Sequence, residues 1–373
     1  MFAAGENLPT LRTRGAADNN TGRESILNNK IFLLLIALAA LQPAFAESFV
    51  VGDVEATRGH RASGYLVVPP GVDEGTKIPI TIVHGAADGP VLALIAGTHG
   101  YEYPGITALQ RVRNSLDPRE VSGTIIMVHI ANLPSFLGRS IYRSPVDGKN
   151  LNRMYPGDPS GSLSQRIAHL VTSEVIDRAD YLIDLHAGDG NEALRPFVYM
   201  PVTGETELDK ASKGLAMAFS LDHIVVDKAP LRTRDDSVYT DQTALVRGIP
   251  AITTETGQMG LNDDYWVDMA VDGIFNVLRH LEMIPGDEKV NEGVTWLTDY
   301  EVIKSPHTGI FQAEVRDGYY IAKGGKLGVL LDFFGDEIEE IRAPFAGVVN
   351  YVIATPPVSQ GEPLAMISRI QAQ

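Results

Sequence analysis

Between Ala62 and Ile284 the sequence alternates strand-like apolar runs with helix-like stretches, and this alternation limits the possible folds more than any other feature. Several runs, such as VLALIAG (91–97) and TIIMVHIA (124–131), are apolar at every position instead of at alternate positions. Strands of that kind are covered on both faces of a sheet. The pattern therefore predicts an α/β fold with a mixed, mostly parallel sheet flanked by helices.

The expected elements follow from these runs. We expect strands at 64–69, 78–85, 91–97, 124–131, 181–187, 197–201, 223–227 and 251–255, and helices at 104–115, 162–179, 206–220, 238–247 and 265–283.

After Pro285 the helical signal stops, and a short repeat follows. SPHTGI (305–310) recurs as APFAGV (343–348), and a Gly-x-x-Leu-x-x-Leu/Ile element follows each copy. Two such strand–turn units predict a small all-β, barrel-sandwich-like module at 300–372 that resembles the biotinyl/lipoyl-carrier fold. The link between the copies (332–340) contains no Lys, so we expect a structural module without a swinging arm.

The N-terminal 1–46 segment has the features of a secretory signal peptide. The apolar run IFLLLIALAAL (31–41) follows Lys30 and precedes Ala44-Phe45-Ala46, which predicts cleavage after Ala46. A membrane anchor is the alternative, but this run is shorter than the ~20 residues that a spanning helix needs. We therefore expect a periplasmic or secreted protein that has no membrane association after cleavage.

Composition excludes several kinds of function. The chain has 31 Lys plus Arg against 47 Asp plus Glu, a formal net charge of −16, so it is not expected to bind nucleic acid. It has no Cys, which excludes disulfides, thiol nucleophiles and zinc–thiolate sites. A metal site in this chain therefore needs His, Asp or Glu as its ligands.

Two motifs carry candidate ligands at the ends of predicted strands. His99 and Glu102 follow the strand at 91–97 and precede Pro104, a residue favoured in the first turn of a helix. His186 ends the strand at 181–187, and Asp184 could orient a ligand on the same face of that strand. Taken singly, each motif is as typical of a solvated loop or a strand cap. Two His and one Glu together are the zinc pattern of carboxypeptidase-like hydrolases.

Two further motifs supply groups for catalysis and binding. Glu255 ends the strand at 251–255, where a carboxylate could accept a proton from an attacking water, although a surface acid is the simpler reading. Asn152 and Arg153 lie in the polar loop NLNRMYPG (150–157), and Arg143 precedes it. Arg side chains bind carboxylates through two hydrogen bonds, so this loop indicates an anionic substrate group.

These stretches together resemble the succinylglutamate desuccinylase/aspartoacylase family of the zinc carboxypeptidase-like superfamily. The matching stretches are GTHGYEYPG (97–105), NLNRMYPG (150–157), DLHAG (184–188) and TTETG (253–257). The resemblance implies one Zn²⁺ per chain, held by His99, Glu102 and His186 in a hydrolase domain at 47–290. It implies that Glu255 and Arg143 are catalytic, and that Asn152 and Arg153 bind the substrate carboxylate. Tyr101 and Tyr103 stand where members often carry small or acidic residues, so the site opening is expected to differ.

Competing motifs lack their structural context. Gly188–Ala193 fits G-x-G-x-x-A, but a strand-like run follows it where a dinucleotide-binding fold needs a helix. The other histidines, at 60, 84, 129, 169, 223, 280 and 307, are interpreted as structural.

The resemblance implies hydrolysis of the amide bond of a small anionic N-acyl amino acid. A metallocarboxypeptidase or murein-peptide amidase acting on short peptides is the alternative within enzymes. A catalytically silent binding protein is the alternative from another class, and the presence of Glu255 argues against it. The acyl group, the amino acid and the oligomeric state stay open.

Overall fold

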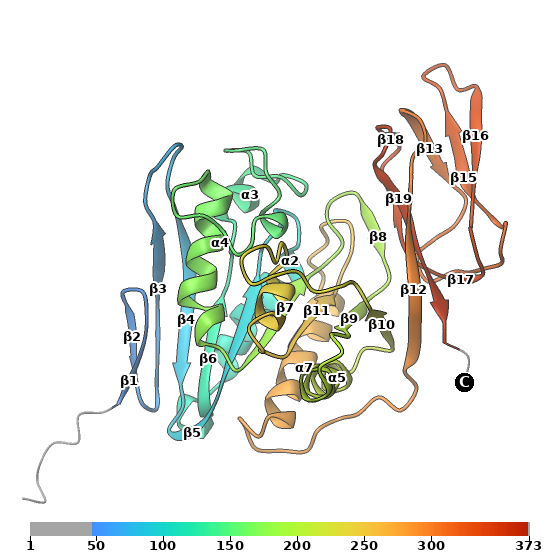
Figure 1. Ribbon diagram of the computed structural model, residues 1–373. Helices are drawn as coiled ribbons and strands as arrows, with labels where there is room; N and C mark the ends of the chain where they lie inside the picture. The colour runs from blue at the N-terminus through green and yellow to red at the C-terminus, as the bar shows by residue number, and fades with distance from the viewer. Residues whose placement is uncertain (1–46, 372–373) are drawn as a thin grey trace, which may run out of the picture. The chain divides into compact units, whose positions relative to one another are not determined.

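The computed structural model describes residues 47–371, and a large mixed β-sheet runs through most of them (Figure 1). In spatial order its strands are β14 (Tyr320–Ile321), β17 (Gly347–Ile353), β19 (Pro363–Ile370), β12 (Thr295–Lys304), β10 (His223–Asp227), β9 (Phe197–Pro201), β11 (Ala251–Glu255), β7 (Tyr181–His186), β5 (Ala87–Ala96), β6 (Ser122–Val128), β4 (Thr76–His84) and β3 (His60–Val68). β8 (Glu192–Leu194) pairs with β17.

The parallel pairings lie in the middle of this sheet. β11, β7, β5 and β6 are parallel neighbours, as are β9, β10 and β12. The remaining strand pairs of the sheet are antiparallel, and they outnumber the parallel ones. The expectation of a mixed sheet is confirmed. The expectation that the sheet is mostly parallel holds only for its centre, because hairpins and the C-terminal strands extend the sheet by antiparallel pairing.

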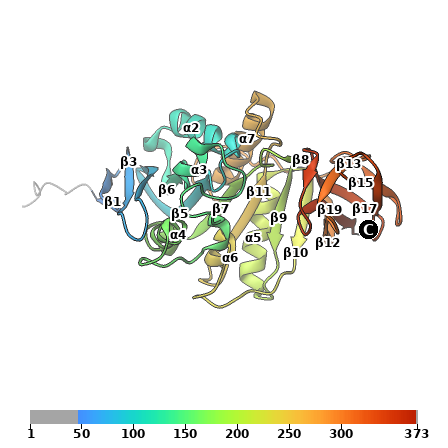
Figure 2. The same ribbon diagram turned by 90° about the horizontal axis from the view of Figure 1, so that it is seen from above.

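Helices cover both faces of the sheet (Figure 2). One apolar core includes residues of α2 (Tyr103–Ser115), α5 (Thr206–Phe219) and α7 (Asp264–His280). The core on the opposite face includes residues of α4 (Leu163–Glu174) and α6 (Thr240–Leu245). Strands β5 and β6 contribute to both cores, which explains why their sequences are apolar throughout.

Every helix expected from the sequence is present, although the one expected at 162–179 ends at Glu174 and is followed by a separate 3₁₀ turn, η3 (Ile176–Arg178). Several short elements before the C-terminal strands are additional: β1 (Ser48–Val51), β2 (Val54–Thr57), β8, α3 (Leu133–Gly138) and the 3₁₀ turns η1 (Pro118–Glu120) and η2 (Leu151–Arg153). Each of these elements is only a few residues long, which is too short for a periodic pattern of apolar residues to be recognised in the sequence.

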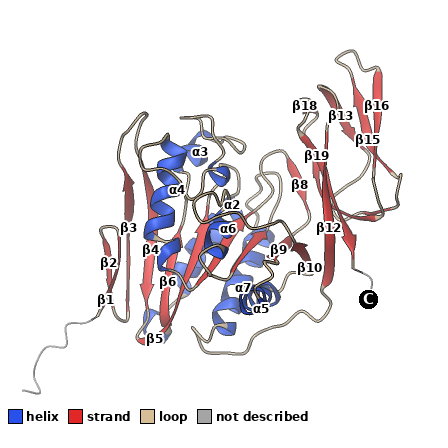
Figure 3. Ribbon diagram, in the orientation of Figure 1, coloured by secondary structure: helices blue, strands red, loops and turns tan. Residues whose placement is uncertain are grey.

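Among the described residues, those from β12 onward form strands and loops (Figure 3). A four-stranded sheet has the order β16 (Glu337–Arg342), β15 (Lys326–Leu331), β13 (Gly309–Ala313) and β18 (Pro357–Val358). The sequence repeat corresponds to two antiparallel pairs, because β13 pairs with β15 in this sheet and β17 pairs with β19 in the large one. Residues of β17 and β19 in the large sheet and of β13 and β15 in the four-stranded sheet share one apolar core.

The predicted signal peptide lies outside the described residues. Within residues 47–371, no helix combines the length and the apolar character needed to cross a membrane.

Candidate active site

His99 and Glu102 lie in the turn that joins β5 to α2. Gly97 allows this turn, because its φ is +69° and a Cβ there would lie 2.8 Å from Ile130 Cα. Glu102 is the N-cap residue of α2, and Pro104 occupies the first turn of that helix, as expected. The turn therefore directs both side chains to the carboxyl edge of the sheet, where open α/β folds bind their ligands.

His186 and Glu255 reach the same edge from neighbouring strands. His186 is the last residue of β7 and Glu255 the last residue of β11. The two strands are parallel, and their register places Glu255 directly opposite His186. Sheet pairing thus unites two residues that are far apart in the sequence.

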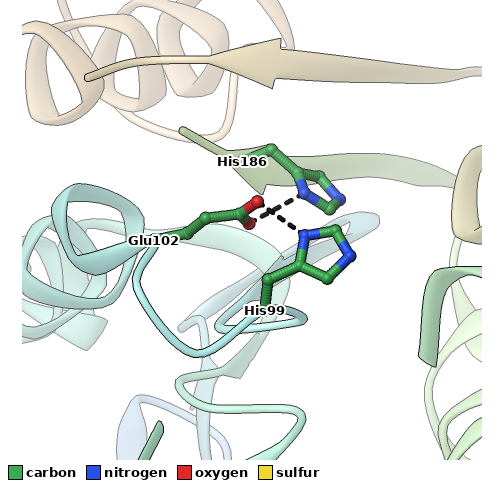
Figure 4. Close-up of side chains that lie close together, drawn as sticks. All are labelled: His99, Glu102 and His186. Carbon is green, nitrogen blue, oxygen red and sulfur yellow. Dashed lines mark hydrogen bonds and ion pairs between the residues drawn. The ribbon is translucent and has the colours of Figure 1, made fainter. Parts of the chain in front are cut away.

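Glu102 lies between the two imidazoles (Figure 4). Its Oε1 is 2.6 Å from His99 Nδ1, and its Oε2 is 2.8 Å from His186 Nδ1. All three side chains are buried, and a ligand atom from each lies within 4.8 Å of the others. The three residues predicted as metal ligands are therefore brought together as expected.

The geometry of this cluster suits a bound cation. Glu102 Oε2 approaches His186 Nδ1 without the alignment of a hydrogen bond and otherwise has no partner, although it is buried. A buried acceptor without a hydrogen bond is costly unless something else satisfies it. Two imidazole nitrogens and a carboxylate oxygen are also the ligand set that zinc prefers in catalytic sites.

The electrostatics favour positive charge at the same point. Burial alone would raise the pKa of Glu102, but the two neighbouring imidazoles lower it to about 2. Burial alone would lower the pKa of both His99 and His186, yet nearby carboxylates raise each of them. The site thus stabilises a negative Glu102 together with a cationic neighbour, and this is a condition that a metal ion also meets.

Two side chains hold the imidazoles from behind. Asp184 Oδ2 lies 2.9 Å from His186 Nε2, which leaves His186 Nδ1 to face Glu102. The predicted contact between Asp184 and a ligand is therefore present. Asn150 Oδ1 lies 3.1 Å from His99 Nε2 in the corresponding position. Such outer contacts set the orientation of a metal-binding imidazole.

Glu255 carries a buried carboxylate oxygen with an unusual environment. Its Oε2 is buried and has no hydrogen-bond partner among the described residues. Burial raises the pKa of Glu255 well above its usual range, and the negative charges of Glu102, Glu192 and Asp184 act in the same direction against the opposing effect of His186. A carboxyl group with a raised pKa can accept and return a proton near neutral pH.

The predicted substrate-binding residues lie on the loop beside this cluster. Asn152 Nδ2 is 3.4 Å from His186 Nε2, and Asn152 Oδ1 accepts hydrogen bonds from the amide and hydroxyl of Thr240. The guanidinium of Arg153 lies 4.6 Å from the centre of the Tyr239 ring and donates to Asn152 O. Asn152 thus contacts the cluster, whereas Arg153 is exposed at its side.

Arg143 lies on the same loop but does not contact the three-residue cluster. Its guanidinium donates to Gly148 O, and its backbone forms an isolated antiparallel bridge with Asn150.

The sequence interpretation missed Asn150, Tyr142, Asp189 and Glu192, which surround the cluster. Asn150 belongs to a motif that was recognised, so its position two residues before Asn152 was a usable signal. Tyr142, Asp189 and Glu192 carried no such signal in the sequence, because Tyr142 and its two partners are about fifty residues apart in the chain.

Three further features singled out in the sequence can be located in the structure. Gly188–Ala193 leads into β8 and not into a helix. Tyr101 packs against Gly190 and Gly260, where an added Cβ would lie 3.1 and 2.7 Å from its ring, and the Tyr101 and Tyr103 rings are 5.9 Å apart. Within residues 47–371, the cluster of His99, Glu102 and His186 is the one group arranged to hold a metal.

The sequence matches the succinylglutamate desuccinylase/aspartoacylase catalytic domain over residues 88–281, more than half of the chain. The chain belongs to the succinylglutamate desuccinylase/aspartoacylase family. A similar protein is the N-alpha-acetyl-L-2,4-diaminobutyric acid deacetylase of Halomonas elongata. It is 29% identical to this chain over 318 residues, which cover 82% of this chain and 91% of the relative.

Solved structures of family members agree with the fold. The succinylglutamate desuccinylase/aspartoacylase from Rhodobacter sphaeroides has a TM-score of 0.75 and 27% identity, covering 84% of this chain and 96% of the other. The product-bound ectoine utilization protein EutE (DoeB) from Ruegeria pomeroyi also has a TM-score of 0.75 and 27% identity, covering 83% and 95%. The α/β fold with a large mixed sheet is therefore the fold of this family.

Proposed function

We propose that this family member is a zinc-dependent hydrolase that cleaves the amide bond of an N-acyl amino acid. The observation that carries the proposal is the placement of His99, Glu102 and His186 around one point, with Glu255 opposite His186 at the adjacent strand end. The deacetylase relative from Halomonas elongata supports a deacylase over a peptidase, and its name makes Nα-acetyl-2,4-diaminobutyrate the first substrate to test.

His99, Glu102 and His186 would hold one Zn²⁺ per chain. When bound, zinc supplies Lewis-acid chemistry for the attack of water on an amide carbonyl. Asp184 and Asn150 keep the imidazoles turned toward Glu102.

The remaining residues move protons and hold the substrate. The buried Oε2 of Glu255 accepts a proton from the attacking water and then delivers it to the departing nitrogen. Arg143 stabilises the negative charge that develops on the carbonyl oxygen. Asn152 and Arg153 hold the substrate carboxylate. The reaction breaks the amide C–N bond: the hydroxyl of the water ends on the released acid, and its remaining proton ends on the released amine.

The first experiment is metal analysis of the purified protein, coupled to a screen of acyl-amino acids against murein peptides. We expect about one zinc per chain, and we expect His99→Ala or His186→Ala to abolish binding, since two ligands leave a weak site. A wild-type protein that stays metal-free after zinc reconstitution contradicts the proposal. Selective cleavage of murein peptides would establish a peptidase instead.

Glu255→Gln separates chemistry from metal binding. The change keeps the shape of the side chain but removes its ability to take a proton, so zinc should remain while kcat falls by ~10²-fold or more. The exposed Glu292→Gln is the matched control and should leave kcat unchanged. Wild-type kcat in Glu255→Gln would exclude Glu255 as the base.

We also propose that the chain is exported and that its domains follow the sequence boundaries. Residues 1–46 would be a signal peptide, 47–290 the hydrolase domain, and 300–372 a barrel-sandwich-like module. Mass spectrometry of protein from the native host should find Glu47 at the N-terminus, and residues 1–46 attached to protein from the envelope fraction would contradict cleavage. Limited proteolysis that cuts in the loop before β12 and leaves two folded fragments would support the division into domains, and fragments that do not stay folded would contradict it.

A further inference from the structure

Tyr142 adopts a backbone conformation that bulky side chains rarely adopt. Its φ is +57°, in the left-handed region that favours glycine. Such a conformation persists only where the surrounding structure imposes it, and it is concentrated at functional sites. Contacts around Tyr142 must therefore stabilise this conformation.

Two carboxylates hold Tyr142. Its backbone N–H donates to Asp189 Oδ2 at 2.9 Å. Its hydroxyl is 2.8 Å from Glu192 Oε1 and 2.9 Å from Asn191 Oδ1, and donates to one of them. Both ends of the residue are thus anchored to the same short segment of chain.

Hydrogen bonds within that segment fix its own conformation. Asp189 is fully buried, and its Oδ1 accepts the N–H of Gly190 at 2.7 Å. Glu192 Oε2 accepts the N–H of Asp189 at 3.0 Å. The segment begins three residues after His186, so a support for Tyr142 is built directly onto the strand end that carries this candidate ligand.

On its other side, Tyr142 contacts the second candidate histidine ligand. Its ring packs edge-on against His99, with ring centres 5.9 Å apart and an interplanar angle of 89°. The next residue, Arg143, pairs through its backbone with Asn150, whose Oδ1 lies 3.1 Å from His99 Nε2. Tyr142 therefore connects three parts of the site: the segment 189–192 that follows His186, the ring of His99 and the backbone of Arg143.

We propose that Tyr142 is a positioning residue that fixes the ring of His99 and the start of the Arg143 segment by clamping both to the segment 189–192. The proposal rests on the proposed zinc site and extends it to a residue that is neither one of the proposed zinc ligands nor one of the proposed substrate-binding residues. Loss of a contact that orients a metal ligand typically costs 10–100-fold in metal affinity or activity. Displacement of a positioned group by about 1 Å can cost about 10²-fold in rate.

Tyr142→Gly is the decisive variant. Glycine adopts φ of +57° without steric cost, so this change relieves the backbone while it removes the ring and the hydroxyl. We expect a folded protein whose zinc dissociation constant, measured on apoprotein by competition with a chelator, rises by about 10-fold or more. We expect kcat to fall with it.

Tyr142→Phe separates the hydroxyl from the ring. It keeps the contact with His99 and the N–H bond to Asp189, so zinc affinity should stay close to wild type while kcat/KM falls by roughly 10-fold. This variant also carries the test if Tyr142→Gly fails to fold. Ser220→Gly is the control, because Ser220 has a φ of +65° beyond the end of α5, and its replacement should change neither zinc affinity nor kinetics.

A folded Tyr142→Gly protein with zinc affinity and kcat within about twofold of wild type would overturn the proposal, as would wild-type kcat/KM in Tyr142→Phe. The proposed function can fail separately. If wild type binds zinc but hydrolyses no acyl-amino acid, chelator competition on Tyr142→Gly still decides whether the clamp exists.

Discussion

The exposed guanidinium of Arg153 is oriented by the Tyr239 ring and by Asn152 O, which leaves its charge close to Asn152 at the edge of the site. If it binds the substrate carboxylate, Arg153→Ala should act mainly through KM, because such a clamp holds the ground state and the transition state alike. A charge-assisted pair is worth ~1.5–3 kcal/mol, so KM should rise by roughly 10- to 150-fold in steady-state assays.

Two controls accompany the Arg153 measurement. Arg153→Lys should recover little, since an ammonium does not reproduce the two-pronged geometry of a guanidinium. The second control is a substrate whose carboxylate has been amidated. Wild type should hydrolyse it much more poorly than the parent substrate, whereas Arg153→Ala should show a much smaller difference between the two substrates. Equal discrimination by both proteins would mean that Arg153 has only a structural role.

His129 makes the stability of the fold depend on pH. Burial, assisted by the charge of Arg113, lowers the pKa of His129 to about 4, whereas an unfolded chain has a His pKa of about 6.5. Between these values the unfolded chain takes up a proton that the folded one does not. The free energy of unfolding should therefore be fully retained above pH ~6.5 and fall by about 3 kcal/mol as the pH drops to about 4.

Urea denaturation across this pH range tests the assignment. His129→Gln keeps a hydrogen-bonding partner for Thr81 Oγ1, which lies 2.8 Å from His129 Nε2, but has no titrating group. Its unfolding free energy should fall less steeply below pH 6.5 than that of wild type. The exposed His60→Gln should follow wild type, and identical slopes in all three proteins would contradict the prediction.

At the scale of elements, the packing of α5 against α7 depends on the absence of a side chain at Gly273. A Cβ there would lie 2.7 Å from the Phe219 ring, which is almost completely buried. Gly273→Ala should gain about 1 kcal/mol of helix propensity but lose ~1–3 kcal/mol to overpacking. The net result expected from thermal or urea unfolding is therefore a loss of stability.

Gly214 in α5 provides the matched comparison. A Cβ at this position would meet the end of the half-buried His280 side chain, 2.8 Å from Nε2, and this side chain can move away. Gly214→Ala should therefore be neutral or stabilising by up to about 1 kcal/mol. If Gly273→Ala proves as stable as Gly214→Ala, the α5–α7 contact is looser than described.

At the scale of the whole molecule, the C-terminal strands add a further apolar core, which lies between two sheets. Phe311 in β13 is 4% exposed within this core, whereas Phe334, between β15 and β16, is 93% exposed. Phe311→Ala should cost ~3–5 kcal/mol of unfolding free energy. Phe334→Ser should stay within about 0.5 kcal/mol of wild type, and a large loss there would show that the Phe334 side chain is covered in solution.

Much of the fold could be predicted from local sequence because its elements are long and periodic. The central strands are apolar throughout and the helices carry apolar faces, so each is recognisable without its neighbours. The turn containing His99 and Glu102 was also predictable, because both residues and Pro104 lie within one short stretch. In these cases the governing interactions are between residues close in sequence.

Only the tertiary structure brought the site together. The parallel register of β7 and β11 places Glu255 opposite His186, and no local pattern contains that register. The support of Tyr142 by Asp189 and Glu192, and the contact of Asn150 with His99, likewise join distant segments. Within the C-terminal region, which was predicted to form a small all-β module, β19 pairs with β12 and so continues the large sheet. Sheet order and the burial of polar groups are properties of the complete chain, because each strand edge and each buried carboxylate must find its partners in other segments.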